Sequence, residues 1–189
     1  MAATEPIRDK KALSRLAGYW LNKDNFRNYT LIVLGVCTML RPCDLLSLTW
    51  SDVYDFERGV FRSHVALTEK KTGKPKVIAL NSQAKEALGL FFPHRRGVFI
   101  FFGKLGSDKA ISRTQAWRIV RAAAGETGET GRVALYSLRK TAGYHAYKSG
   151  VSPVLLMTVF NHSSFEVTKR YLGVTQDELD SVYLSAALF

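Results

Sequence analysis

The sequence predicts a mostly α-helical protein with a small antiparallel β-sheet, an α+β fold. Apolar residues recur at helical spacing through much of the chain, most densely in the segment 25–40. Two short apolar runs in the first half are separated by a turn that contains Gly73 and Pro75, a pattern typical of a β-hairpin. Together these observations favour helices around a small sheet.

The first half of the chain is expected to hold two helices and the hairpin. Helices are expected at 8–21 and 25–40, and the second is apolar on nearly all sides, so we expect it at the centre of the fold. Pro42 ends that helix and suits the first turn of another. Strands are expected at 60–65 and 76–80, joined by a basic turn.

The second half is expected to be helical after one further extended segment. A helix at 82–91 precedes a short strand or extended run at 98–102. A capping-box pattern, Ser112 to Gln115, opens a helix that reaches about residue 124, and the glycine-rich segment 125–131 forms a loop. Further helices are expected at 137–149, 152–160, 164–171 and 177–188, and a second capping-box pattern at 163–166 begins the third of these.

Length and composition fit one soluble domain that spans residues 1–189. No apolar run approaches the roughly 20 residues of a membrane helix, and the N-terminus lacks the apolar core of a signal peptide. Cys37 and Cys43 fit neither a disulfide framework nor a metal-site spacing. We therefore expect a cytoplasmic protein with no membrane partner.

The charge is strongly positive. Lys and Arg number 27 against 16 acidic residues, which gives a net charge of +11. Such an excess attracts polyanions, nucleic acid first. A ribosomal protein, a membrane-surface protein or a merely solubilising surface would also fit the charge. The sequence motifs must therefore distinguish between these classes of protein.

Four polar elements follow one another at characteristic separations: Arg41 within 41–45, Arg139 within 136–139, His162 within 161–164, and then Tyr171. In order and spacing they resemble the active site of the tyrosine recombinases, the phage-integrase family. That family usually shows Arg-x-x-(Glu/Asp)-Leu, a lysine in a β-hairpin, His-x-Leu-Arg, Gly-His-Ser-Ser and a nucleophilic tyrosine. The resemblance runs from about residue 8 to about residue 180.

Two positions depart from the family pattern. Tyr136 stands where the family usually has histidine, which puts one acid/base role in doubt because a phenol has weaker acid/base capacity at neutral pH. Asn161 stands where the family usually has glycine. Asparagine tolerates left-handed backbone angles better than most residues, so we expect only a loop variation there.

The resemblance implies a catalytic set that acts without metal, ATP or another cofactor. Its members are Arg41, Lys71, Tyr136, Arg139, His162 and Tyr171. Tyrosine can form a covalent phosphoryl intermediate, and arginine donates a rigid fork of hydrogen bonds to phosphate oxygens. Lys71 would protonate the 5′-oxygen leaving group, and His162 would bind a non-bridging oxygen or assist proton transfer. Asp44 is expected to orient Arg41.

The residues themselves also suggest how this set converges. Arg41 precedes a helix that begins with proline, Arg139 is expected in a first helical turn, and His162 precedes a capping serine. Helix N-termini bind phosphate, so three helix starts would meet at one anion. The competing tyrosines, Tyr144, Tyr147 and Tyr183, lack the spacing to His162.

We expect the partner to be double-stranded DNA, bound beyond the active site by Lys70, Lys74, Lys76, Arg113, Arg118 and Arg121. Phosphate contacts would position the protein, and base contacts would select the site. The resemblance implies a homo-oligomer on DNA, a tetrameric synapse, in which the C-terminal helix docks on a neighbouring protomer. Packing of that helix on its own domain is the alternative.

The function implied is that of a site-specific recombinase of a phage, bacterium or other mobile element, acting through a 3′-phosphotyrosine in integration, excision or inversion. No separate N-terminal core-binding domain is expected, so the chain would be an excised catalytic domain or a short recombinase like the fimbrial-switch invertases. A non-catalytic DNA-binding regulator with the same fold and a type IB topoisomerase are the alternatives.

Overall fold

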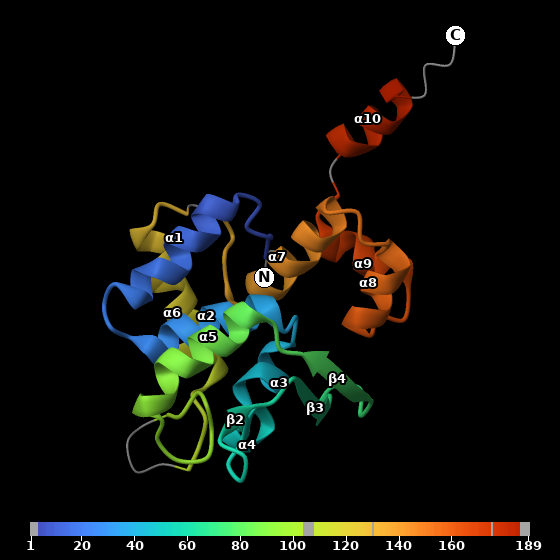
Figure 1. Cartoon of the computed structure of the whole chain (residues 1–189). Helices are drawn as coiled ribbons and strands as arrows, with labels where there is room; N and C mark the ends of the chain where they lie inside the picture. Colours follow the sequence, from blue (N-terminus) through green and yellow to red (C-terminus); the bar gives the residue numbers. More distant parts are fainter. Residues whose placement is uncertain (1–3, 104–107, 130, 175, 186–189) are drawn as a thin grey trace.

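The computed structural model describes residues 4–103, 108–129, 131–174 and 176–185 (Figure 1). Helices dominate, and the strands are short. The elements in chain order are α1 (Lys10–Leu21), α2 (Phe26–Cys37), α3 (Pro42–Leu46), α4 (Trp50–Val53), β1 (Tyr54–Asp55), β2 (Val60–Phe61), β3 (His64–Thr68), β4 (Pro75–Ala79), α5 (Ser82–Phe91), the 3₁₀ turn η1 (Phe92–His94), α6 (Arg113–Glu126), α7 (Leu135–Lys148), α8 (Pro153–Phe160), α9 (Phe165–Leu172) and α10 (Gln176–Ser185).

Helix α2 lies at the centre of the main body, as its apolar sequence predicts. It packs against α1, α5 and α7 and buries Leu31, Ile32 and Leu34. It begins at the cap Asn25 and ends earlier than expected, because Met39 takes a left-handed conformation with φ of 51° that cannot continue a helix. The chain therefore turns before Arg41 and reaches α3.

The predicted hairpin is confirmed, with a correction at its first strand. β3 and β4 pair antiparallel from His64 opposite Ala79 to Thr68 opposite Pro75. The expected strand 60–65 is two strands, because the chain changes partners in its middle. β2 pairs with β1, which the sequence analysis missed, and only β3 belongs to the hairpin. The expected strand 98–102 makes only isolated bridges at Phe99 and Phe102.

Capping chemistry fixes the start of α6 as expected. Ser112 Oγ accepts from the Gln115 backbone N–H at 3.1 Å, and the Gln115 side chain accepts from the Ser112 N–H at 3.2 Å. The second expected capping box is wrong. Helix α9 begins after Ser164, which makes no side-chain cap hydrogen bond.

Helices α8 and α9 form a small second core beside α7 (Figure 1). Its buried residues are Leu156, Phe160 and Leu172. Gly143 of α7 allows this packing, since a Cβ atom at that position would lie 2.5 Å from the Phe160 ring. The close approach brings the end of α8 against the helix that carries Arg139.

Helix α10 projects away from the rest of the molecule (Figure 1). Its Tyr183 and Leu184 side chains are 79% and 80% exposed. Among the described residues, none of the helices has both the length and the apolar character needed to cross a bilayer.

Replacing Gly143 by alanine tests the contact between α7 and α8. We expect Gly143→Ala to lower the free energy of unfolding by about 1–3 kcal/mol, the usual cost of overpacking a core, because the Phe160 ring must shift. Urea denaturation measures this. Gly18→Ala is the control, since its Cβ meets nothing within 4 Å inside α1 and should be neutral or stabilising. Equal effects of the two substitutions would contradict the close contact.

Candidate active site

Arg41 lies at the N-cap of α3, where its backbone is extended and Pro42 begins the helix. The side chain points inward and is buried. Its Nη2 donates to the Phe160 carbonyl oxygen at 3.2 Å, and its Nη1 lies 2.5 Å from Glu69 Oε2. The second contact is an ion pair without hydrogen-bond geometry, so Nη1 keeps an unused donor. Burial and these partners fix the guanidinium in one orientation.

Arg139 meets Arg41 at the same carbonyl. Its Nη2 donates to the Phe160 oxygen at 2.8 Å, its Nη1 donates to the Met39 oxygen, and its Nε is buried without a partner among the described residues. The side chain is 1% exposed. Burial lowers its pKa to about 10, with the charge of Arg41 as the next cause, and Arg139 stays protonated at neutral pH. The expected place in a first helical turn is wrong, because α7 begins at Leu135.

The carbonyl that joins the arginines belongs to the C-terminal end of α8. Asn161 caps this helix in the left-handed conformation, with φ of 54°, as its sequence position predicts. The Asn161 and His162 N–H groups donate to Thr158 and Met157, the pattern of a Schellman motif. Two late carbonyls of α8 remain for side chains, those of Val159 and Phe160.

His162 and Tyr171 lie together beside this helix end. Their ring centroids are 4.6 Å apart, edge to face, and the Phe160 ring stacks on His162 at 5.2 Å. His162 Nδ1 is 3.0 Å from Thr168 Oγ1, one turn before Tyr171 in α9. The Arg139 guanidinium carbon lies 5.7 Å from the centre of the Tyr171 ring. The structure therefore brings Arg41, Arg139, His162 and Tyr171 into one site.

Burial sets the protonation of both rings. It lowers the pKa of His162 to about 4, and the charges of Arg139, Arg41 and Lys76 act in the same direction. Burial also raises the pKa of Tyr171, while the charge of Arg139 opposes that rise. At neutral pH the imidazole is neutral and the phenol keeps its proton. If Tyr171 is a nucleophile, as predicted, its proton must be removed before it attacks.

The lysines of the hairpin occupy two different places. Lys70, Lys71 and Lys74 lie exposed in or beside the turn between β3 and β4. Lys76, expected to contact DNA, instead points inward from β4. Its Nζ donates to the Val159 oxygen at 2.7 Å and lies 3.5 Å from Glu69 Oε1. The ammonium of Lys76 therefore lies in the interior of the site with Arg41, Arg139 and Glu69, a buried charged group called the pocket below, and Lys71 is displayed outside it.

Two polar residues of the site were not singled out by sequence reasoning for the part they play. Glu69 is fully buried and accepts from Asn161 Nδ2 at 2.9 Å in addition to its pairing with Arg41. Asn161 therefore does more than turn the chain. The expectation that Asp44 orients Arg41 is replaced, since Asp44 Oδ1 accepts from the Lys70 backbone N–H at 2.9 Å. Nothing in residue spacing distinguishes Glu69, because burial of the carboxylate depends on the fold.

Tyr136 lies at the edge of the site, in the first turn of α7. It lines a hollow of about 550 Å³ with Arg113 and the exposed Trp117 of α6. Arg118 is exposed on the same helix. Arg121 is exposed too, and its Nη1 donates to the Val133 oxygen at 3.3 Å. The structure thus joins Tyr136 to the predicted DNA-binding helix through Arg113.

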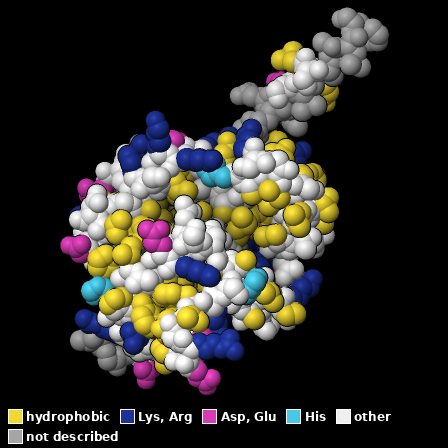
Figure 2. All heavy atoms as spheres, viewed as in Figure 1, with side chains coloured by type: hydrophobic (Ala, Val, Ile, Leu, Met, Phe, Trp, Pro, Cys, Tyr) yellow, Lys and Arg dark blue, Asp and Glu magenta, His cyan; other side chains and the backbone are white. Residues whose placement is uncertain are grey.

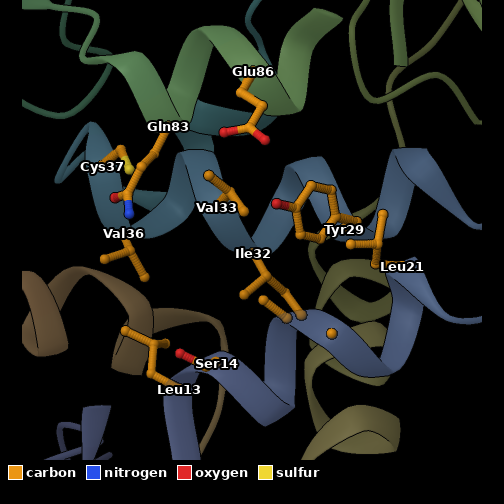
Figure 3. A pocket seen from close by; sticks show the side chains of 12 residues that line it. Leu13, Ser14, Leu21, Tyr29, Ile32, Val33, Val36, Cys37, Gln83 and Glu86 are labelled. Atoms are coloured by element: carbon orange, nitrogen blue, oxygen red, sulfur yellow. The ribbon is translucent and has the colours of Figure 1, made fainter. Parts of the chain in front are cut away.

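A second hollow lies elsewhere, between α1, α2 and α5 (Figure 3). Its volume is about 310 Å³, and Tyr29, Cys37 and Glu86 are among its lining residues. None of the predicted catalytic residues lines it. The candidate site is therefore the group of residues at the end of α8 and not this hollow.

Comparisons with known proteins give the family of this chain. Residues 9–178 match the model of the phage integrase family. The chain is 33% identical to the probable integrase/recombinase YoeC of Bacillus subtilis (strain 168), over 97% of each sequence. The crystal structure of XerA recombinase superposes with a TM-score of 0.75 at 16% identity, covering 99% of this chain and 67% of XerA. The XerH site-specific recombinase in its post-cleavage complex with the palindromic difH substrate gives 0.75 at 15% identity, covering 96% and 53%.

These similarities identify the class: the chain belongs to the phage integrase family, the tyrosine recombinases. The chain shares the fold of the matched parts of XerA and XerH. The expectations of an integrase-type DNA recombinase and of its α+β fold are confirmed. The chain spans 53% of the XerH chain, so the longer relative has parts that this sequence does not cover.

The low pKa of His162 predicts a pH-dependent stability. The unfolded chain binds a proton at His162 near pH 6.5, whereas the folded chain does so only near pH 4. The contribution of neutral His162 is therefore fully present above pH 6.5 and is lost as the pH falls towards 4. We expect wild type to lose unfolding free energy relative to His162→Gln over this window. Urea denaturation at fixed ionic strength measures it, and parallel pH curves would contradict the burial argument.

Proposed function

We propose that this chain cuts and rejoins DNA through a covalent bond between Tyr171 and a 3′-phosphate. The observation that carries the proposal is the convergence of two buried arginines on one carbonyl beside the Tyr171 ring. Both guanidinium groups keep one buried nitrogen without a hydrogen-bond partner among the described residues, Nη1 of Arg41 and Nε of Arg139. Positioned cationic donors of this kind stabilise the charge that develops on a phosphate during in-line attack.

In the proposed step, the Tyr171 oxygen gives its proton to water and forms a bond to phosphorus, while the bond from phosphorus to the 5′-oxygen breaks. Lys71 supplies a proton to the departing oxygen. Neutral His162 donates a hydrogen bond to a non-bridging oxygen, and the hydroxyl of Tyr136 assists from the edge of the site. The reverse attack by a 5′-hydroxyl restores the phosphodiester, so the bond energy is conserved in the intermediate.

DNA would bind across the exposed basic residues that surround the site. These are Lys70, Lys71 and Lys74 of the hairpin turn with Arg113, Arg118 and Arg121 of α6. Dark blue Lys and Arg side chains occur over much of the visible face (Figure 2), which suits contact with a polyanion. Lys76 is not part of this outer set, because its ammonium lies in the pocket.

Exposed apolar side chains support assembly of several copies on DNA. Yellow side chains gather over α8 and α9 in Figure 2, where Val154, Leu155 and Phe165 are exposed. Helix α10 displays Tyr183 and Leu184 on a projecting element. Large exposed apolar patches mark interaction sites. We propose that α10 of one protomer docks on the apolar surface of a neighbour, as the resemblance implies.

Removing the Tyr171 oxygen tests the nucleophile. We expect Tyr171→Phe to retain fold and DNA affinity but to yield no denaturant-resistant protein–DNA adduct, because the ring still packs and only the attacking atom is lost. The probe is a set of nicked duplexes taken from the DNA that flanks the gene. Adduct formation is followed on denaturing gels without added divalent metal.

Tyr183→Phe serves as the matched control, since its side chain is 79% exposed on α10 and should cleave like wild type. An adduct that persists in Tyr171→Phe would overturn the assignment. A wild-type protein that binds DNA but never cleaves it would favour the alternative of a non-catalytic DNA-binding regulator. Relaxation of supercoils without exchange between two sites would favour the topoisomerase.

Assembly is tested by Tyr183→Ser combined with Leu184→Ser. We expect unchanged unfolding free energy, because both side chains are largely exposed, and reduced formation of complexes that hold two DNA sites. Native gels and sedimentation measure these complexes. The control pair is Val60→Ser with Val98→Ser, which removes exposed apolar side chains elsewhere. Loss of stability in the α10 variant, with assembly intact, would support packing of α10 on its own domain.

A further inference from the structure

Glu69 occupies an unusual position for a carboxylate in a DNA-binding protein. It directly follows β3, and its side chain is fully buried at 0% exposure. An isolated buried carboxylate is strongly unfavourable, so its partners must compensate. Those partners lie on both sides of it, in the hairpin turn and in the catalytic pocket.

On the hairpin side, Glu69 organises the turn that displays Lys71. Its N–H donates to the Lys74 oxygen at 2.9 Å, and its oxygen accepts from the Gly73 N–H at 2.8 Å. The Thr72 hydroxyl donates to Glu69 Oε2 at 2.8 Å. Both the backbone and the side chain of Glu69 thus determine the shape of this turn.

On the pocket side, the same carboxylate contacts three elements. Arg41 Nη1 of α3 lies 2.5 Å from Oε2, Lys76 Nζ of β4 lies 3.5 Å from Oε1, and Asn161 Nδ2 at the end of α8 donates to Oε2 at 2.9 Å. Asn161 immediately precedes His162. One side chain therefore connects the hairpin, the first arginine and the loop that carries the histidine.

The charges of the pocket show what the carboxylate does. Arg41 and Lys76 form ion pairs with Glu69, the one acidic side chain that the described structure places in such contact with either of them. Arg139 is a third cation, and the charge of Glu69 acts on it without an ion-pair contact. Buried like charges repel, and an opposite charge offsets the repulsion. Because three cations face one carboxylate, positive charge remains to attract a phosphodiester.

We propose that Glu69 is a positioning residue for strand cleavage, holding Arg41 and Lys76 in the phosphate pocket and tying both to the turn that carries Lys71. The inference rests on the proposed roles of Arg41 and Lys71. Asn161, at the position where the family usually has glycine, supplies the third contact, so this arrangement belongs to the particular residues of this chain. Glu69 touches the cations and not the reacting atoms.

A second consequence concerns the charge of Lys76. Burial lowers its pKa, and the positive charges of Arg139 and Arg41 lower it further, whereas Glu69 raises it. His162 lies near the same charges but is itself neutral above pH 6.5, so it adds no charge that acts on Lys76 in that range. Removing the negative charge of Glu69 leaves Lys76 facing cations alone. Its pKa then falls, and the ammonium is lost at lower pH than in wild type.

The experiment compares Glu69→Gln, Glu69→Asp and wild type. Single-turnover cleavage of the nicked duplexes is measured from pH 6 to pH 10, as rates at saturating protein. For Glu69→Gln we expect a rate about 10²-fold lower, the scale of a misplaced catalytic group, with the alkaline fall in rate shifted to lower pH. Glu69→Asp keeps the charge, so its rate should fall while its pH profile stays near that of wild type.

Glu57→Gln makes the same chemical change in an exposed turn and should leave rate and profile unchanged. A wild-type rate and profile in Glu69→Gln would overturn the proposal. So would equal losses in Glu69→Gln and Glu69→Asp with unchanged pH profiles, since that result marks a merely structural role.

A readout that needs no cleavage separates this proposal from the proposed function. ¹⁵N-labelled lysine NMR follows the titration of Lys76 Nζ in the protein alone, and we expect its pKa to be lower in Glu69→Gln than in wild type. An unchanged titration overturns the positioning role whatever the cleavage result. If wild type forms no adduct but the pKa of Lys76 is lower in Glu69→Gln, the proposed recombinase mechanism is wrong. The pairing of Glu69 with Lys76 is then still supported.

Discussion

The site depends on one end of a helix, the last turn of α8. Its final carbonyls have no helical partners, and the helix dipole makes them negative. The Phe160 oxygen accepts from both Arg41 and Arg139, and the Val159 oxygen accepts from Lys76. Three cations from three parts of the chain thus meet at one helix C-terminus. Phosphate sites are often built directly from helix N-termini. Here a helix C-terminus instead collects the cations that would bind the phosphate.

Several features of the sequence serve this helix end. Asn161 adopts the left-handed angle that closes the helix and directs its amide to Glu69. Gly143 lets α7 approach so closely that the Phe160 ring lies under Arg139, whose guanidinium carbon is 4.8 Å from the ring centre. Thr168 holds the imidazole of His162 on the other side. Backbone geometry, a missing Cβ atom and two short polar side chains together fix the catalytic candidates.

The sequence predicts the elements of the fold more completely than it predicts the positions of the side chains in the site. Apolar periodicity places α2 and α5, and Gly73 with Pro75 marks the hairpin, because local pattern determines these elements. The motif order identifies Arg41, Arg139, His162 and Tyr171 as neighbours. The spacing of residues does not show which way a side chain points. Lys76 was therefore predicted to contact DNA at the surface, although its ammonium is paired with Glu69 in the interior of the site. Glu69 was not predicted as a site residue for the same reason, since only the tertiary fold buries it. The expected meeting of three helix starts is wrong at Arg139, because α7 begins at Leu135, two residues before the expected start, and Arg139 therefore lies beyond the first turn.

Ionic strength should act differently on the exposed contacts to DNA and on the buried arginines, because the arginines are bonded to backbone carbonyls. Contacts between exposed lysines and DNA phosphates weaken steeply as salt is added, since counterions compete for both partners. The bonds from Arg41 and Arg139 to Phe160 are buried, and dissolved ions screen buried pairs far less. Added salt should therefore remove DNA from this protein while leaving the guanidinium groups in place. A protein released by salt and returned to dilute buffer needs no rearrangement of its pocket before it binds again.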